Sequence, residues 1–356
     1  MPSPTLRKNK ASVAVTSGMR TWALLALFPS LALAQAYTIQ KSNTTENLRG
    51  LSAPSNKVIW ASGTHGSYLR STDGGSSWHV AEVAGAEKLD FRDVEAFDAE
   101  VAYLLSAGPG EQSRIYKTND GGKSWVLQFT NGEPKGFFDC MAFWNRDHGV
   151  AVGDPVDGKF EIITTENGGK SWNAAPPEIL PPALPGEGAF AASGSCIAVQ
   201  GKTNVWFATG GTAARVFHSA DGGKTWTVVD TPIMHDDDSS GIFSIAFRDD
   251  KHGIIAGGDY KGPDKSGANL AFTDDSGGTW KLVQKSPQWY MSGVAFDLTR
   301  HEPAIFTVGS AHAGYAKSLA GKSWQKMWDL NLNAVTFYAP GKAIAVGPKG
   351  LIVSLH

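Results

Sequence analysis

Short runs of alternating apolar and polar residues recur along this chain, and no stretch shows the 3.6-residue period of an amphipathic helix. Residues 115–117 and 216–218 each lead into a glycine-rich turn. Residues 101–105 and 205–209 have the pattern of a further strand, which precedes residues 115–117 and 216–218 respectively. The pattern therefore predicts an all-β protein built from many short strands.

One turn sequence, Ser/Thr-x-Asp-x-Gly-x-Ser/Thr-Trp, recurs with little change. Its conserved positions are Asp73 and Trp78, Asp120 and Trp125, Asn167 and Trp172, Asp221 and Trp226, and Asp275 and Trp280. A sixth copy, residues 318–324, keeps Trp324 but lacks the acid. Successive Trp residues are 47, 47, 54, 54 and 44 positions apart, which is the range of a four-stranded propeller blade.

Each position of this turn has a local physical reason. An Asp side chain accepts hydrogen bonds from backbone N–H groups of its own turn, and Gly supplies the positive φ that the turn needs. The Ser or Thr hydroxyl adds a second local hydrogen bond, and the Trp ring is large enough to be buried between strands. We expect these residues to be structural.

The six turns mark six blades, and the inner strands indicate a seventh. These strands align at residues 94, 141–143, 197–199, 245–247, 294–296 and 335–337. The last of these begins a unit without a box turn that ends one strand short, whereas residues 37–40 form a strand without a blade. Pairing the two closes the ring and removes both free edges. The sequence thus predicts a seven-bladed β-propeller, with six blades as the alternative.

The N-terminal segment has the pattern of a secretory signal peptide. Four basic residues precede an apolar run that ends in Ala32-Leu33-Ala34. We therefore divide the chain into a signal peptide, 1–34, and a single propeller domain, 35–356, and expect export to the periplasm or the medium. No segment reaches the length of a membrane span. Removing four of the 32 basic residues leaves 28 against 34 acidic ones, a formal charge of −6, which argues against nucleic-acid binding.

The two cysteines, Cys140 and Cys196, occupy the same position in neighbouring repeats. They are too few for a disulfide framework, and no metal-ligand spacing surrounds them. We expect them to pack as small apolar residues on inner strands. A bridge between them is the alternative, since export permits it but the spacing of inner strands decides it.

The tandem turns resemble the Asp-box (BNR) propellers, and within them the photosystem II stability/assembly factor family and its exported bacterial relatives, which are often labelled oxidoreductase. The resemblance covers residues 35–356 and implies a binding or assembly role. Sialidases also carry such boxes, but their Arg-Ile-Pro motif is missing here. The resemblance to sialidase chemistry therefore fails at the residues that perform it.

Candidate binding residues lie on the face opposite the boxes, where strand two joins strand three and one blade joins the next. They are Arg49, His65, Arg92, Asp93, Asp139, Asp154, Asp157, Glu187, Asp259, Tyr260 and His312. We expect a polar funnel of mixed charge around the axis, suited to a polar ligand or a peptide. The alternative is a rim of ion pairs, for example Arg92 with Asp139. The run His235-Asp236-Asp237-Asp238 is expected to be a solvated acidic loop, because Phe247 stands where a calcium loop needs Glu.

We expect a non-enzymatic, monomeric, exported propeller that binds a protein or peptide, without cofactor or metal. The second hypothesis is a glycan-binding or glycan-hydrolysing propeller using a pair such as Asp93 with Asp139 or Asp154. Among enzymes, a glycoside hydrolase fits better than an oxidoreductase, because no Gly-x-Gly-x-x-Gly lies between a strand and a helix.

Overall fold

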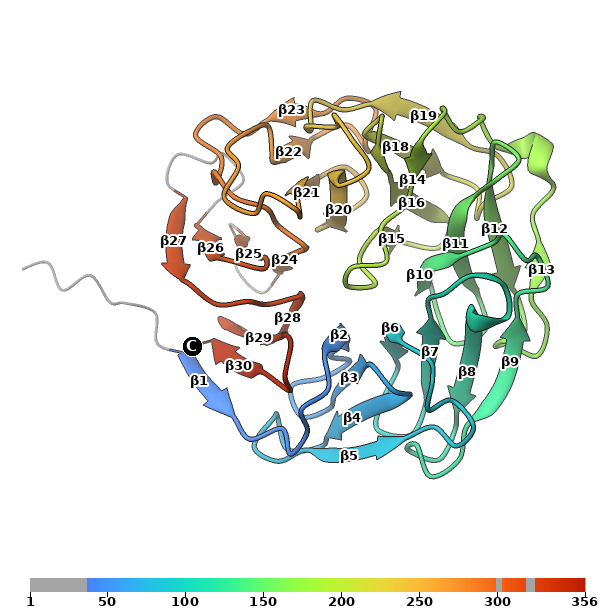
Figure 1. The fold of residues 1–356 in the computed structure, drawn as a ribbon, viewed down its shortest axis with the longest axis vertical. Coiled ribbons are helices and arrows are strands. Elements are labelled where there is room, and N and C mark those ends of the chain that lie inside the picture. The colour runs from blue at the N-terminus through green and yellow to red at the C-terminus, as the bar shows by residue number, and fades with distance from the viewer. Residues whose placement is uncertain (1–36, 299–302, 318–323, 356) are drawn as a thin grey trace, which may run out of the picture. The chain divides into compact units, whose positions relative to one another are not determined.

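The computed structural model describes residues 37–298, 303–317 and 324–355. These residues form seven antiparallel sheets arranged in a ring, each the blade of a β-propeller (Figure 1). The predicted seven-bladed fold is confirmed. Helical turns within the described ranges are limited to η1 (Gly110–Gln112) and η2 (Pro177–Ile179).

The blades follow one another in chain order. Blade 1 contains β2 (Leu48–Ser52), β3 (Ile59–Gly63), β4 (Ser67–Ser71) and β5 (His79–Glu82), and blade 2 contains β6 (Phe91–Ala96), β7 (Ala102–Ser106), β8 (Arg114–Thr118) and β9 (Val126–Thr130). Blade 3 contains β10 (Phe138–Phe143), β11 (Gly149–Val156), β12 (Lys159–Thr165) and β13 (Asn173–Ala174), and blade 4 contains β15 (Ile197–Gln200), β16 (Asn204–Ala208), β18 (Arg215–Ser219) and β19 (Thr227–Asp230). Blade 5 contains β20 (Ser240–Phe247), β21 (Gly253–Asp259), β22 (Leu270–Thr273) and β23 (Lys281–Leu282), and blade 6 contains β24 (Gly293–Asp297), β25 (Ala304–Val308), β26 (Ala313–Ala316) and β27 (Gln325–Trp328).

Blade 7 closes the ring by combining both ends of the described chain. Its inner strands are β28 (Ala334–Ala339), β29 (Lys342–Val346) and β30 (Ile352–Leu355), and its outer strand is β1 (Tyr37–Gln40). β1 runs antiparallel to β30, with Tyr37 opposite Leu355 and Gln40 opposite Ile352. The predicted closure by the N-terminal strand is therefore confirmed, whereas the predicted signal peptide lies outside the described residues.

The box turns contain the local hydrogen bonds that their residue types predict. In the first, Asp73 accepts the backbone N–H of Ser77 at 2.9 Å and the hydroxyl of Ser71 at 2.8 Å. Hydrogen bonds from Ser77 and Ser71 hold the pKa of Asp73 at about 2. Gly74 and Gly75 have φ of 72° and 86°, the left-handed region that glycine enters without strain. Most of the sixth turn lies outside the described residues.

Apolar side chains pack between neighbouring blades and hold the ring together. Trp206 of β16 in blade 4 is fully buried, stacks on Phe247 of blade 5 at 3.8 Å, and donates Nε1–H to the Ser276 carbonyl at 2.8 Å. Trp60 joins blade 1 to blade 2 in the same way through the Asp98 carbonyl. Such inter-blade contacts give the faces of the ring a fixed shape on which loops can present a site.

Candidate functional site

One long connection sets the shape of the face opposite the boxes. Residues 175–196 join blade 3 to blade 4 and contain β14 (Glu187–Gly188), which pairs with β17 (Gly210–Gly211) and extends the sheet of blade 5 to six strands. After β14 the chain turns into the centre of the ring. We call residues 189–195 the axial segment.

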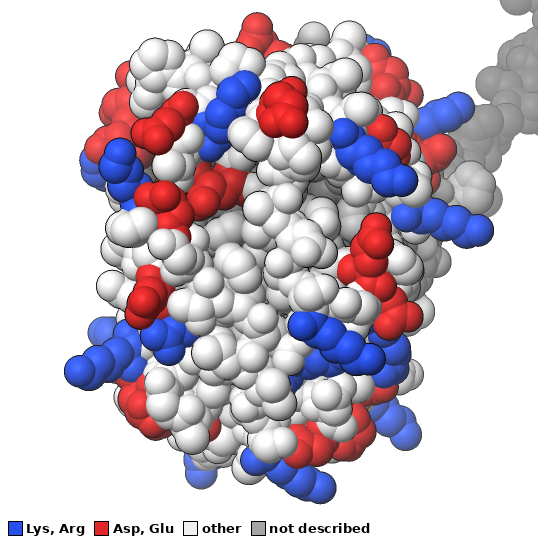
Figure 2. All heavy atoms as spheres, turned by 90° about the vertical axis from the view of Figure 1, so that its right-hand side faces the viewer, with Lys and Arg blue, Asp and Glu red and all other residues white. Residues whose placement is uncertain are grey.

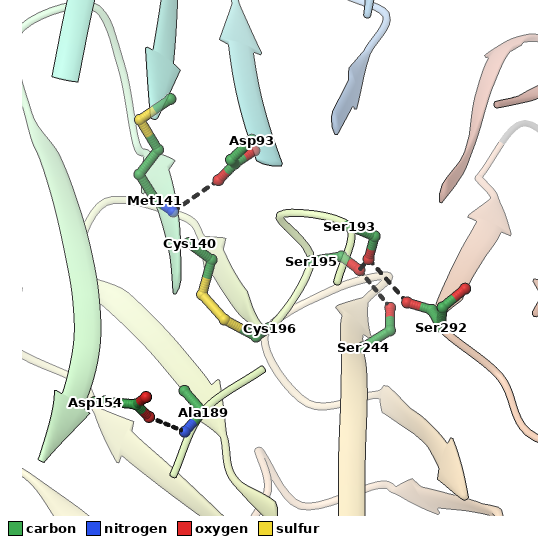
Figure 3. The surroundings of a disulfide bond; sticks show 10 residues. All are labelled: Asp93, Cys140, Met141, Asp154, Ala189, Ser193, Ser195, Cys196, Ser244 and Ser292. Atoms are coloured by element: carbon green, nitrogen blue, oxygen red, sulfur yellow. Dashed lines mark hydrogen bonds between the residues drawn. A yellow bond between two sulfur atoms is a disulfide. The ribbon is translucent and has the colours of Figure 1, made fainter. Parts of the chain in front are cut away.

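The axial segment is hydrogen-bonded to blades on opposite sides of the ring. Figure 3 shows its contact with Ser292. On blade 2, Arg92 donates Nη1–H to the Ala191 carbonyl at 3.2 Å. On blade 6, the Ser292 carbonyl accepts the Ser193 hydroxyl at 2.8 Å. The segment therefore occupies the region of the axis where the sequence predicts an open funnel.

A disulfide bond fixes the end of this segment. Cys140 on β10 and Cys196, just before β15, are bonded with their Cα atoms 6.1 Å apart (Figure 3). The expectation that both would remain as packed free thiols is wrong, because the inner strands of adjacent blades lie within the Cα separation that a disulfide spans.

Two candidate acids hold backbone N–H groups. Asp93 accepts the Met141 N–H at 2.7 Å, joining blade 2 to blade 3, and Asp154 accepts the Ala189 N–H of the axial segment at 2.9 Å. Gly194 lies so close to Asp93 that a Cβ would be 2.1 Å from its Oδ1. These carboxyl groups therefore position the protein's own chain.

The axial acids also have raised pKa values. Burial raises the pKa of Asp154 to about 6, and burial, followed by the charge of Asp154, raises the pKa of Asp139 well above its ordinary range. Burial and then the charge of Glu95 raise the pKa of Asp93, and burial raises the pKa of Glu95 itself to about 7. Each of these shifts favours the neutral carboxyl form, which does not need a cationic partner.

The predicted ion pair between Arg92 and Asp139 is absent from the described residues. Arg92 instead bonds Asp90 through Nε at 2.8 Å, while Asp139 is buried and its Oδ2 has no hydrogen-bond partner among the residues that the structure describes. Glu187 has a full set of partners: Arg215 Nε at 2.9 Å, the Thr209 hydroxyl at 2.6 Å and the Leu184 N–H at 2.8 Å. Glu187 thus anchors the long connection rather than facing a ligand.

An open cleft of about 620 Å³ lies beside the axial segment. Its lining consists of Lys135, Asp154, Pro155, Gly158, residues 183–190, Gly210, Gly211 and Asp238. Backbone and small side chains form most of the wall, and the freely exposed charges are at the rim. Lys135 lies 3.6 Å from Asp157 in an ion pair whose side chains are 74% and 85% exposed, so both charges can be redirected to a ligand at little cost.

An aromatic cluster continues the cleft towards blade 5. Phe190 stacks on Phe243 at 3.9 Å, and Phe243 contacts the rings of Tyr260 at 6.1 Å and Tyr290 at 4.8 Å. Tyr290 is buried, but Tyr260 is 46% exposed. Leu184, on the cleft wall, is 45% exposed. Together the cleft and Tyr260 form what we call the cleft surface.

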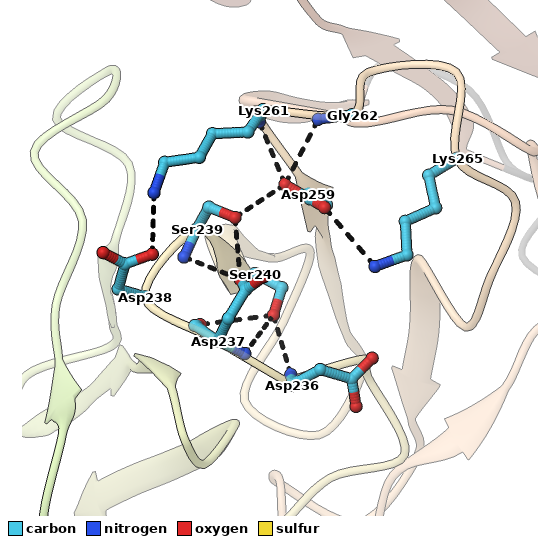
Figure 4. A network of polar contacts seen from close by, with 9 residues as sticks. All are labelled: Asp236, Asp237, Asp238, Ser239, Ser240, Asp259, Lys261, Gly262 and Lys265. Carbon is cyan, nitrogen blue, oxygen red and sulfur yellow. Dashed lines mark hydrogen bonds and ion pairs between the residues drawn. The ribbon is translucent and has the colours of Figure 1, made fainter.

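The acidic loop between β19 and β20 borders this surface (Figure 4). Asp237 accepts the Ser239 N–H at 2.9 Å, and Asp238 pairs with Lys261 at 2.8 Å. Asp259 bonds the Ser239 hydroxyl at 2.8 Å and the Lys261 N–H at 2.9 Å. Hydrogen bonds outweigh the opposing effect of burial and lower the pKa of Asp259. These contacts fix the loop beside Tyr260.

The remaining candidates lie apart from the cleft lining. His65 bonds Glu46 at 2.6 Å, which raises the pKa of His65. His312 lies between two carboxylates, Asp264 at 2.7 Å and Asp329 at 2.6 Å. Arg49 is half-buried, with its Nε lacking a hydrogen-bond partner within the described part of the chain.

Asp154 and Glu187 were among the predicted candidates, but sequence reasoning missed the other residues that build the cleft surface, including Phe190, Phe243 and the rest of the wall at 183–188. One signal was present: the interval from Trp172 to Trp226 is 54 residues instead of 47. A repeat that is longer by seven residues indicates an inserted connection, and such insertions lie on one face of a repeat protein.

Charges of both signs alternate along the two rims of the ring on the side drawn in Figure 2, and the band between them is mainly uncharged. Neither sign dominates that side. Within the described ranges, no helix is long and apolar enough to cross a membrane.

Solved structures resemble the chain over about nine-tenths of its length. YCF48 bound to a D1 peptide matches with a TM-score of 0.64 at 15% identity, covering 90% of this chain and 96% of that one. YCF48 from Cyanidioschyzon merolae matches with a TM-score of 0.64 at 19% identity, covering 90% and 99%. The fold is that of a YCF48-like propeller. The GH74 enzyme of Niastella koreensis matches at 0.61 and 16% identity, but this chain spans only 53% of that enzyme. No family model and no curated protein matches the sequence.

Proposed function

We propose that this protein is exported and acts without catalysis, by binding a segment of a protein partner on the cleft surface. The main observation in support is that its polar groups have two different roles. The axial acids Asp93 and Asp154 hold the protein's own backbone, whereas the cleft wall is open, built largely from backbone, and bordered by exposed Lys135, Asp157 and Asp238.

Such a surface suits an extended peptide. Exposed Tyr260 and Leu184 provide apolar contact, and rim charges of both signs orient the partner. The resemblance to YCF48, a propeller solved with a D1 peptide, supports a peptide-binding role for a ring of this shape.

Hydrolysis of a glycan is less well supported by the geometry. Retaining and inverting glycosidases need two carboxyl groups facing one bond. Among the acids of the cleft lining, Asp154 holds Ala189, Glu187 is fully bonded to Arg215 and its neighbours, and Asp238 is paired at the rim. No two of these acids are therefore free to act together on one bond.

Two features support export. The first 34 residues have the order of a signal peptide, and the disulfide between Cys140 and Cys196 suits an oxidising compartment. Intact-mass measurement of the secreted protein is expected to give a chain that begins at Gln35. A full-length chain retained in the cytosol would contradict export.

Cross-linking capture from a periplasmic extract tests the binding proposal. The protein is compared with a Leu184→Ser/Tyr260→Ala variant of the cleft surface and with a Val126→Ala/Leu127→Ala variant on the outer strand β9, where both side chains are about half exposed. We expect partners that are captured by the protein and the outer-strand variant but lost from the cleft variant. Partners retained by the cleft variant, or release of sugar from an oligosaccharide panel, would count against the proposal.

A further inference from the structure

A second cavity, of about 300 Å³, lies on the propeller axis between the axial segment and the box face. Its walls come from the inner strands of blades 1, 5, 6 and 7: Leu51, Ala246, Phe247, Val294, Ala295, Phe296, Ala334, Val335, Thr336 and Phe337. Ser193 and Ser195 of the axial segment line its inner end, and Leu298, 56% exposed, lies at the other. This cavity shares no lining residue with the cleft.

The sequence explains why the axis is hollow here. The middle position of the inner strand holds Ala142, Ala198, Ala246, Ala295 and Thr336 in blades 3 to 7. Because neighbouring blades cover both faces of each sheet, the partial exposure of Ala246 and Ala295 is exposure to the axial channel. Small side chains at these places leave space that larger ones would fill.

The inner end of the cavity carries a chain of hydroxyl groups whose direction is fixed. The Ser193 hydroxyl donates to the Ser292 carbonyl at 2.8 Å, since a carbonyl only accepts. Ser195 must then donate to Ser193 at 2.6 Å, and Ser244 to Ser195 at 2.7 Å. The chain begins at the Val294 N–H, which donates to Ser244 at 3.0 Å.

This polarity determines what the inner end offers to a ligand. A hydroxyl group has one donor and two acceptor lone pairs. The donors of Ser193 and Ser195 are both used, and from the described residues each oxygen accepts only one hydrogen bond, so each keeps an acceptor site. Thr336, on the wall, can rotate its hydroxyl to donate or to accept and does not set a preference.

We propose that the axial cavity is a binding site for a compact aromatic molecule that carries one N–H or O–H donor directed at Ser193 and Ser195. The apolar wall favours an aromatic ring, and the two free acceptor sites favour a ligand that carries a hydrogen-bond donor. The volume is at the lower end of the range for small-molecule sites. A ligand that presents only an acceptor leaves both serine oxygens without a donor and faces their lone pairs.

Indole and benzofuran test this, because they have nearly the same shape but differ in an N–H donor against a ring oxygen. Titration calorimetry with the full protein is expected to show indole binding about ten-fold more tightly than benzofuran, the factor that corresponds to one unmade buried hydrogen bond. Equal affinities, or no binding of indole, would overturn the proposal.

Three variants separate the site from general effects on folding. Ser195→Ala removes one acceptor and is expected to weaken indole several-fold while leaving benzofuran unchanged; a Ser195→Ala protein that binds both rings as before contradicts the assignment. Ala295→Leu fills the cavity and is expected to abolish binding with an unchanged melting temperature. Its matched control is Ala198→Leu, at the same strand position in blade 4 but outside the cavity lining. Indole binding that survives Ala295→Leu would also contradict the site.

Discussion

Breaking the disulfide is expected to destabilise the protein strongly. Cys140 and Cys196 are 56 residues apart and close a loop that contains the outer strands of blade 3 and the whole long connection. The chain-entropy relation gives a contribution of about 4 kcal/mol at 25 °C for a loop of that length. Because Cys196 follows the axial segment directly, its loss also releases one end of that segment.

The measurement is urea denaturation followed by tryptophan fluorescence, for the oxidised protein and for Cys140→Ala, Cys196→Ala and the double variant. The two single variants and the double variant break the same bond, so we expect similar losses of unfolding free energy in all three. Dithiothreitol is expected to lower the stability of the unmodified protein but not of the double variant.

A change below about 1 kcal/mol in the double variant would refute the reasoning, because it would mean that the loop is equally restricted without the bond. Native-state hydrogen exchange adds a local readout. Loss of the disulfide in the double variant is expected to speed amide exchange at Ala189 and Ala191 of the axial segment more than on the outer strands.

Three further predictions concern single groups. The pKa of Glu95 is raised to about 7, so the folded state binds the proton more tightly than the unfolded state. Its contribution to stability should therefore fall by about 2 kcal/mol between pH 4.5 and 7.5. Glu95→Gln should reduce the change in the denaturation midpoint across that range, and the part due to other buried acids such as Asp154 should remain. Arg215→Met leaves Glu187 buried without its cation and should cost about 3–5 kcal/mol of unfolding free energy. Adding Glu187→Gln to the same chain should restore much of that loss. Fully additive losses in the double variant would contradict the pairing. Asp221→Ala removes the hydrogen bonds of one box turn and should cost about 1 kcal/mol by thermal unfolding, whereas Asp221→Asn, the residue found in the third box, should cost less.

The fold could be predicted from sequence because its information is local and repeated. Each box turn fixes its own hairpin through neighbouring side chains, as Asp73 and Ser77 illustrate. Closure by β1 followed from counting strands, since the last unit lacked one. Neither inference needed distances between residues far apart in the chain.

The site was harder to predict because it depends on a segment that occurs once. Residues 175–196 follow no repeat, and their path into the axis is fixed by distant partners such as Arg92 and Ser292. The sequence predicted Asp93, Asp139 and Asp154 on the axial face. It did not show that Asp93 and Asp154 hold backbone groups there, nor that Cys140 and Cys196 lie close enough to bond.

Hydrogen exchange of the protein with and without its captured partner tests the central claim most directly. Binding on the cleft surface predicts that the partner slows exchange in residues 183–190 and around Tyr260, and leaves the box turns unchanged. Protection confined to the box face or to the outer strand β9 would contradict it.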